Sequence, residues 1–205
     1  MSLIYGYSEM LKLTLASQSP RRKELLEGLG IPFSIRPANI NEDISFKSPL
    51  ELATNLSKLK ASALECLSGE VIVASDTVVA IDGEVLGKPG DLNQARDFLN
   101  RLSGKTHQVI TGVTLLNSKE SKTFAVETEV EFYSISDELL EQYLLTQDSL
   151  DKSGGYGIQG QAQVFIKSLR GSYSSVVGLP MAELYLNLRE FCRLRSGQKL
   201  SEIFS

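Results

Sequence analysis

The segment TLASQSPRRKELLEGL, residues 14–29, carries the signals that decide how the fold begins. Its apolar start predicts a short β-strand, which ends at Ser17-Gln18-Ser19. Pro20 then marks the first turn of a helix, because the N–H that proline lacks would be unpaired at that position. Leucines at 25, 26 and 29 give this helix an apolar stripe, and Gly30 suits its end.

Two arginines, Arg21 and Arg22, fall in the first turn of the predicted helix. The helix dipole disfavours cations there and favours anions. The pair is explained if an anion binds at the same place, since the hydroxyls of Ser17 and Ser19, free backbone N–H groups and two guanidinium groups form a phosphate-binding set. The alternative is an ordinary surface helix with two solvated arginines, and this segment alone does not separate the two.

The composition predicts a single domain of 205 residues that can bury a core and form a cleft. A net charge of −4 argues against broad binding to nucleic acid or to an anionic membrane. Cys66 and Cys192 form no metal or redox motif, which favours a reducing, cytoplasmic setting. The sequence has no apolar run long enough to predict a membrane span, and residues 1–12 lack the pattern of a secretory signal.

A second helix is predicted from Ser48-Pro49-Leu50-Glu51, which combines a cap, a first-turn proline and a capping-box glutamate. We expect it to continue to about Leu67. Lys60 falls on its apolar face, four residues from both Leu56 and Leu64. The lysine either extends to the edge of the helix or reaches into a site.

A strand buried on both faces is predicted from the apolar runs at 71–74 and 78–81. Ser75-Asp76-Thr77 interrupts it, and an aspartate inside such a strand is costly unless it is paired or bound to a cation. Asp82-Gly83 predicts a hairpin turn, and Lys88 follows the returning strand.

The rest of the chain alternates between helical and strand patterns. We expect a helix capped by Asp91, paired strands at 109–116 and 123–134, a helix at 136–146, a glycine-rich loop at 151–160, a strand at 162–166, a polar loop at 171–178, a helix from Pro180 and a loose tail at 196–205. This mixture predicts an α/β fold with a mixed sheet flanked by helices.

Two familiar signals do not fit their surroundings. GYGIQG at 155–160 matches the dinucleotide-binding pattern, but it follows a polar loop and precedes a predicted strand rather than a helix. The only histidine, His107, has no partner at metal-ligand spacing, so we interpret it as a structural hydrogen-bonding residue.

The remaining polar groups make sense together around a polyphosphate. They are Ser17, Ser19, Arg21, Arg22, Glu42, Lys60, Asp76 and Lys88, with Lys152, Tyr156 and Gln159 of the glycine-rich loop. Arginines and lysines neutralise phosphates, while carboxylates hold Mg²⁺, which keeps several waters and bridges phosphate oxygens. A carboxylate or the metal then activates water for attack on phosphorus.

Six segments in order make the sequence resemble the Maf family of nucleoside triphosphate pyrophosphatases. They are LASQSPRRKELL, ASDTVV, GKP, LSGKTHQVITGV, DKSGGYGIQG and GSYSSVVGLP. The resemblance implies an elongated α/β fold with two lobes and a central cleft, related to that of the inosine triphosphate pyrophosphatases. It also implies conversion of a nucleoside triphosphate and water to the monophosphate and pyrophosphate with Mg²⁺ or Mn²⁺. The catalytic domain would span 13–195, after an N-terminal extension at 1–12.

By position, Asp76 matches the family's catalytic acid, which suits both a general base and a metal ligand. Glu42 matches the second acidic position, and Lys60 and Lys88 match the lysines that contact the phosphates. Arg22, Ser17, Ser19 and Lys152 are assigned to substrate binding. A homodimer is expected from the family alone.

Three positions are expected to determine substrate specificity. The residues there, Arg21, Thr77 and Gln159, resemble those of the family branch that hydrolyses dTTP and UTP. A glutamine amide both donates and accepts, as the O4 and N3–H edge of thymine or uracil requires. The branch that prefers 7-methyl-GTP carries a bulky aromatic residue where this chain has Arg21, and that specificity is the alternative within enzymes. A nucleotide-binding regulator of septation, without significant turnover, is the alternative of another class.

Overall fold

The computed structural model describes residues 10–205, so most of the expected N-terminal extension, residues 1–9, lies outside it. The described chain forms one seven-stranded sheet with the order β2-β1-β3-β5-β6-β7 and β4 beside β3. Its strands are β1 (Lys12–Leu15), β2 (Ser34–Ile35), β3 (Glu70–Ile81), β4 (Glu84–Leu86), β5 (Thr106–Leu116), β6 (Ser121–Phe132) and β7 (Ile166–Arg170). β1 is parallel to β2 and β3, and every other pairing is antiparallel. The predicted mixed sheet is confirmed.

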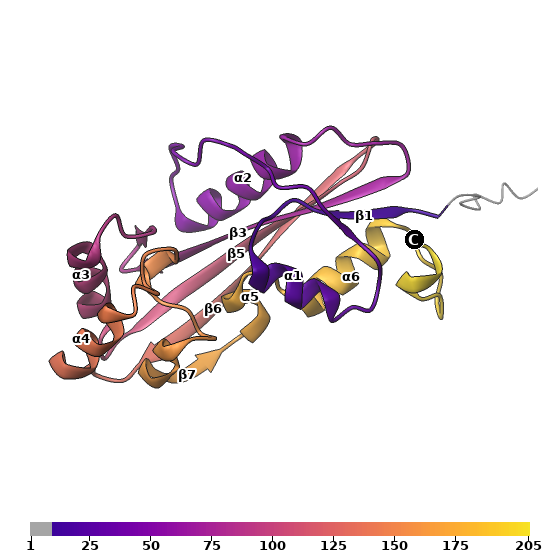
Figure 1. The fold of residues 1–205 in the computed structure, drawn as a ribbon. Coiled ribbons are helices and arrows are strands. Elements are labelled where there is room, and N and C mark those ends of the chain that lie inside the picture. Colours follow the sequence, from indigo (N-terminus) through magenta and orange to yellow (C-terminus); the bar gives the residue numbers. More distant parts are fainter. Residues whose placement is uncertain (1–9) are drawn as a thin grey trace, which may run out of the picture.

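The molecule is elongated because β3, β5 and β6 run the length of the sheet (Figure 1). One face is covered by α2 (Pro49–Ser62). On the other face, α1 (Pro20–Glu27), α5 (Tyr173–Val177) and α6 (Met181–Phe191) lie towards one end. The helices α3 (Leu92–Leu102) and α4 (Asp137–Leu145) lie at the opposite end.

Of the four hydrophobic clusters in the described residues, the two largest lie at the two ends, and the two smaller ones lie beneath α2. The first joins Leu15 of β1 and Val73 of β3 to α1 and α6. The second joins Val79 of β3 to Leu99 of α3 and Leu140 of α4. The long strands pass from one core to the other, so the protein has two lobes on a common sheet.

The helix starts were predicted well, because local capping chemistry specifies them. Ser19, Ser48 and Asp91 are the N-caps of α1, α2 and α3, and each accepts a hydrogen bond from the backbone three residues on. The expected end of α2 near Leu67 was wrong. The helix stops at Ser62, because the chain must turn back to enter β3 at Glu70, and Leu67 is left half exposed.

Two elements after residue 160 differ from expectation. Residues 162–166, expected as a strand, belong mostly to a 3₁₀-helix at Gln161–Phe165, and β7 begins only at Ile166. Ala162 and Phe165 are its buried residues, and this spacing of three matches the 3₁₀ repeat. The expected polar loop at 171–178 contains the short helix α5.

The expectation of a loose tail at 196–205 was wrong. Leu200, Ile203 and Phe204 are buried in the first core, and a 3₁₀-helix spans Leu200–Glu202. Leu11 pairs in parallel with Phe204, and the Ser205 N–H donates to the Leu11 carbonyl at 2.9 Å. Burial of three large apolar side chains outweighs the entropy of ordering this segment. The folded unit therefore extends past both boundaries expected for the domain.

Candidate active site

The candidate site lies at the middle of β3, where polar residues separate the two cores. Val73 belongs to the first core and Val79 to the second, and Ser75, Asp76 and Thr77 lie between them. Along one edge of β3, β1 pairs as far as Val73 and β4 pairs from Val79 onward. The edge between these two strands opens into a cleft of about 770 Å³.

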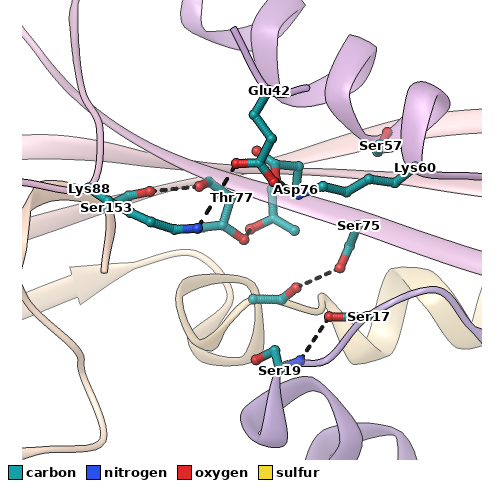
Figure 2. Close-up of polar contacts among 12 residues, drawn as sticks. Ser17, Ser19, Glu42, Ser57, Lys60, Ser75, Asp76, Thr77, Lys88 and Ser153 are labelled. Atoms are coloured by element: carbon teal, nitrogen blue, oxygen red, sulfur yellow. Dashed lines mark hydrogen bonds and ion pairs between the residues drawn. The ribbon is translucent and has the colours of Figure 1, made fainter. Parts of the chain in front are cut away.

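Asp76 faces α2, and the lysine predicted on the inner side of that helix meets it there. Lys60 Nζ donates to Asp76 Oδ1 at 2.5 Å and lies 2.6 Å from Glu42 Oε1 (Figure 2). Lys60 is 9% exposed and Asp76 7% exposed. Of the two alternatives for this lysine, the structure selects the one in which it reaches into a site. The ion pair also compensates the burial of a charged aspartate inside a strand.

Glu42 lies on the loop before α2 and approaches a second lysine, Lys88, at 4.0 Å. Burial by itself raises the pKa of Glu42, but the hydrogen bond from Lys60 and the charges of Lys60, Lys88 and Arg22 bring it below its usual value. Glu42 is therefore ionised at neutral pH. The contact between Glu42 and Lys88 also links the loop before α2 to the segment after β4.

Thr77 lies on the opposite face of β3, where the half-buried guanidinium of Arg22 of α1 reaches it. Arg22 donates to the Gly178 carbonyl at 3.0 Å, to the Thr77 hydroxyl at 3.3 Å and to the Ser17 hydroxyl at 3.4 Å. Burial lowers the pKa of Arg22, although the charge of Asp76 opposes this. These contacts connect α1, β3 and the turn before α6, so Arg22 holds three parts of the cleft wall together.

The serines of the β1–α1 loop are arranged by local hydrogen bonds. Ser17 Oγ accepts the Ser19 N–H at 3.1 Å (Figure 2). Ser19 Oγ accepts the Arg22 N–H at 3.4 Å. Both serines line the cleft together with Arg21. The predicted grouping of serines, arginines and a helix start at one wall is what the structure contains.

The glycine-rich loop forms the facing wall and carries Gln159, which is exposed and lines the cleft. Arg21 Nη1 lies 3.9 Å from Asp151 of this loop. Lys152, which is predicted to bind substrate, lines the cleft and is hydrogen-bonded within the loop. Its ammonium contacts the Asp148 carbonyl at 2.7 Å, Asp148 Oδ1 at 2.6 Å and Asp151 Oδ1 at 2.6 Å.

The two acidic residues suit a divalent cation that is shared with a substrate. Glu42 and Asp76 both contact Lys60 Nζ, so their carboxylates face the same small volume. No group of three or more His, Cys, Asp or Glu residues within 10–205 forms a complete metal cage. Mg²⁺ commonly binds through one or two carboxylates, with substrate phosphates and waters as its other ligands, so the pair fits such an ion.

Several residues that shape the site were not predicted. Gly112 pairs directly with Asp76 across β3 and β5, and a Cβ there would lie 2.3 Å from the Ala53 carbonyl oxygen of α2. The hydroxyls of Thr111 and Thr77 are hydrogen-bonded to each other at 2.9 Å. The Ser153 hydroxyl donates to the Thr77 carbonyl at 3.1 Å. The sequence offered one signal for Gly112: a glycine inside the apolar run 109–116 often marks a place where another backbone comes close to the strand.

His107 has the structural role expected of it. It is buried, and its Nε2 lies 2.7 Å from the hydroxyl of Tyr156. Burial lowers the pKa of His107 to about 4, so the ring is neutral at physiological pH. It packs beneath the glycine-rich loop, in the second core, through edge contacts with Phe132 and Tyr156.

The fold and the site define an α/β protein with a cleft between two lobes, lined by arginines, lysines and a lysine-linked carboxylate pair. Within that class, the chain belongs to the Maf family: residues 12–191 match the family model described as Maf-like protein. It is 43% identical to a dTTP/UTP pyrophosphatase of Bacillus cytotoxicus, over 89% of this chain and 96% of the relative. It is 45% identical to a dTTP/UTP pyrophosphatase of Carboxydothermus hydrogenoformans, over 88% and 99%.

Among solved structures, a HAM1 protein from Coxiella burnetii aligns with a TM-score of 0.49 and 16% identity, over 88% of this chain and all of that one.

Proposed function

We propose that this protein hydrolyses pyrimidine nucleoside triphosphates, dTTP and UTP, to the monophosphate and pyrophosphate. The observation that carries the proposal is the contact of Lys60 with both Asp76 and Glu42 in the wall of the cleft. A carboxylate pair held by a lysine beside a group of arginines and serines is suited to a polyphosphate and a water nucleophile. The relatives named dTTP/UTP pyrophosphatase support the same reaction.

In this mechanism the cleft walls bind the triphosphate. Lys88 and the serine-rich start of α1 supply positive charge and hydrogen-bond donors to the phosphate oxygens. Arg22 is held by three protein acceptors and keeps this wall in place. Asp76 accepts a proton from the attacking water, and Lys60 fixes the direction of its carboxylate.

Asp76 and Glu42 would also hold a divalent cation, Mg²⁺ or Mn²⁺. When bound, such an ion neutralises charge on the phosphate oxygens and lowers the pKa of water. The depressed pKa of Glu42 leaves its carboxylate free of a competing proton at neutral pH.

Recognition of the base is assigned to Gln159, Thr77 and Arg21, all of which line the cleft. The Gln159 amide can donate to O4 and accept from N3–H of thymine or uracil. Adenine and cytosine place an amino donor and a ring-nitrogen acceptor at these positions, so an amide held in this orientation would be left unpaired, which costs binding energy.

A panel of triphosphates with Mg²⁺ or Mn²⁺ tests the proposal by pyrophosphate release. The panel contains dTTP, UTP, CTP, 7-methyl-GTP and the four standard purine nucleotides. We expect dTTP and UTP to give the highest kcat/KM. A preference for 7-methyl-GTP would overturn the assignment of Arg21, Thr77 and Gln159, and nucleotide binding without any turnover would favour the regulatory role.

The setting of the reaction is also a proposal. The described residues contain no helix long and apolar enough to cross a membrane. Cys66 and Cys192 are both free thiols, which suits the reducing conditions of the cytoplasm. The homodimer expected from the family is tested by light scattering of the purified protein.

A further inference from the structure

The ammonium of Lys152 has no hydrogen-bonding capacity left for a phosphate. Lysine has three N–H donors, and three acceptors surround this one at 2.6–2.7 Å: the Asp148 carbonyl, Asp148 Oδ1 and Asp151 Oδ1. The residue is only 8% exposed, although it lines the cleft. To contact a phosphate directly, it would have to break a partly buried, charge-assisted hydrogen bond.

The loop that carries Gln159 is built against this ion pair. Gly157 and Gly160 close a turn around Gln159, with the Gly160 N–H donating to the Gly157 carbonyl at 3.1 Å. A Cβ at Gly157 would lie 2.7 Å from the Lys152 stem, and a Cβ at Gly160 would lie 2.8 Å from Asp148 Oδ2. Both ends of the turn therefore rest on the Lys152–Asp148 pair without space for a side chain.

The same pair also connects to the opposite wall of the cleft. Asp151 accepts from Lys152 and lies 3.9 Å from Arg21 of α1. Burial raises the pKa of Asp151, but the hydrogen bond and charge of Lys152 and the charge of Arg21 together lower it. Lys152 thus organises two of the groups assigned to base recognition, Gln159 directly through the turn and Arg21 through Asp151.

We propose that Lys152 and Asp148 are positioning residues for base recognition: their ion pair fixes the 157–160 turn so that Gln159 faces the base, and Lys152 does not bind phosphate. This inference rests on the proposed function, in which Gln159 recognises thymine or uracil. It assigns a role to Asp148, which does not line the cleft. It also accounts for glycine at 157 and 160.

Two probes separate base positioning from phosphate binding. One is a non-hydrolysable α,β-imido analogue of dUTP, and the other is inorganic tripolyphosphate, which has no base. Calorimetry gives the Kd of each for the wild type, Lys152→Met and Asp148→Asn. We expect both variants to weaken binding of the analogue by about tenfold, the effect of one well-placed hydrogen bond, and to leave the Kd of tripolyphosphate unchanged.

A phosphate-binding Lys152 predicts the opposite pattern. Lys152→Met would then weaken tripolyphosphate binding, and Asp148→Asn would strengthen it by releasing the ammonium. Either result overturns the inference. Retained tripolyphosphate binding also shows that a variant is folded around the cleft. Lys167→Met is the matched control. Lys167 is an exposed lysine of β7 that pairs with Glu131 of β6, outside the cleft.

A double-mutant cycle tests the coupling to Gln159. If the ion pair acts mainly through the turn, Lys152→Met should weaken analogue binding much less in a Gln159→Ala background than in the wild type. Full additivity would contradict the inference. Failure of the proposed function is recognised separately, because a wild type that binds the analogue but does not hydrolyse dTTP leaves these binding comparisons intact.

Discussion

Lys60 and Asp76 form a buried ion pair of 2.5 Å between a helix and the middle of the sheet. Their positions are set by different elements, α2 and β3, which pack on each other along their lengths. Glu42 completes the arrangement at 2.6 Å from the same ammonium. Because one lysine fixes two carboxylates, the geometry of the reactive groups depends on how α2 lies on the sheet.

Replacement of Lys60 tests this dependence directly. Lys60→Met keeps much of the stem but removes the charge, so Asp76 and Glu42 repel each other and lose their shared donor. We expect kcat for dTTP to fall by about 100-fold or more, as when a preorganised donor is removed from an active site. Steady-state kinetics measures the change.

Lys58→Met is the matched control for that variant, since Lys58 is an exposed lysine on the same helix. Its kcat should equal that of the wild type. Near wild-type kcat in Lys60→Met would show that the ion pair has no part in the reaction.

Gly112 sets the distance between α2 and the sheet beside Asp76. A methyl group at this position would lie 2.3 Å from the Ala53 carbonyl oxygen, which is backbone and cannot rotate away. Gly112→Ala should therefore shift α2, lower kcat and reduce the free energy of unfolding by about 1–3 kcal/mol, the usual cost of overpacking. Urea unfolding and kinetics give the two quantities.

Gly90→Ala provides the comparison for this substitution. A Cβ at Gly90 meets only the Gln94 side chain, at an ordinary contact distance of 3.6 Å. We expect little change in either quantity. Equal behaviour of the two variants would mean that the close contact at Gly112 does not position the helix.

His107 should make stability depend on pH. Burial lowers its folded-state pKa to about 4 from 6.5, so between these values the unfolded chain binds the proton more strongly. The free energy of unfolding must then decrease as the pH falls from about 6.5 to 4, by up to about 3 kcal/mol from this residue. Urea unfolding at several pH values measures the slope, and His107→Gln should have a flatter one in this window. Parallel slopes would contradict the assignment.

The C-terminal segment should contribute to stability but not to catalysis. Phe204 is 2% exposed in the first core, and Phe204→Ala should lower the free energy of unfolding by about 3–5 kcal/mol. Leu186→Ala, at a residue that is 63% exposed on α6, should change it by less than about 0.5 kcal/mol. Assayed well below the melting temperature, both variants should keep the wild-type kcat. An unchanged free energy of unfolding in Phe204→Ala would indicate that the C-terminal segment is a loose tail after all.

Features specified by neighbouring residues were predictable from the sequence. The N-caps Ser19, Ser48 and Asp91 and the hairpin turn at Asp82-Gly83 depend on local hydrogen bonds and backbone angles, and all are present. The unusual position of Lys60 on an apolar helix face also indicated a site. In each case the signal lay within a few residues of the feature.

Features that depend on distant contacts were not predictable in the same way. Phe204 is buried because β1 lies beside it, and Lys152 is engaged because Asp148 and Asp151 turn towards it. The segment Gln161–Phe165 has a strand-like composition, yet the second core fixes it as a 3₁₀-helix. Tertiary packing overrides local preference at these places.

Product analysis of dTTP hydrolysis by the wild type and Asp76→Asn tests the central claim most directly. The account predicts equal amounts of dTMP and pyrophosphate from the wild type. It predicts almost no product from Asp76→Asn, which should still bind the α,β-imido dUTP analogue. Near wild-type turnover by Asp76→Asn, or dTDP and phosphate as the wild-type products, would contradict it.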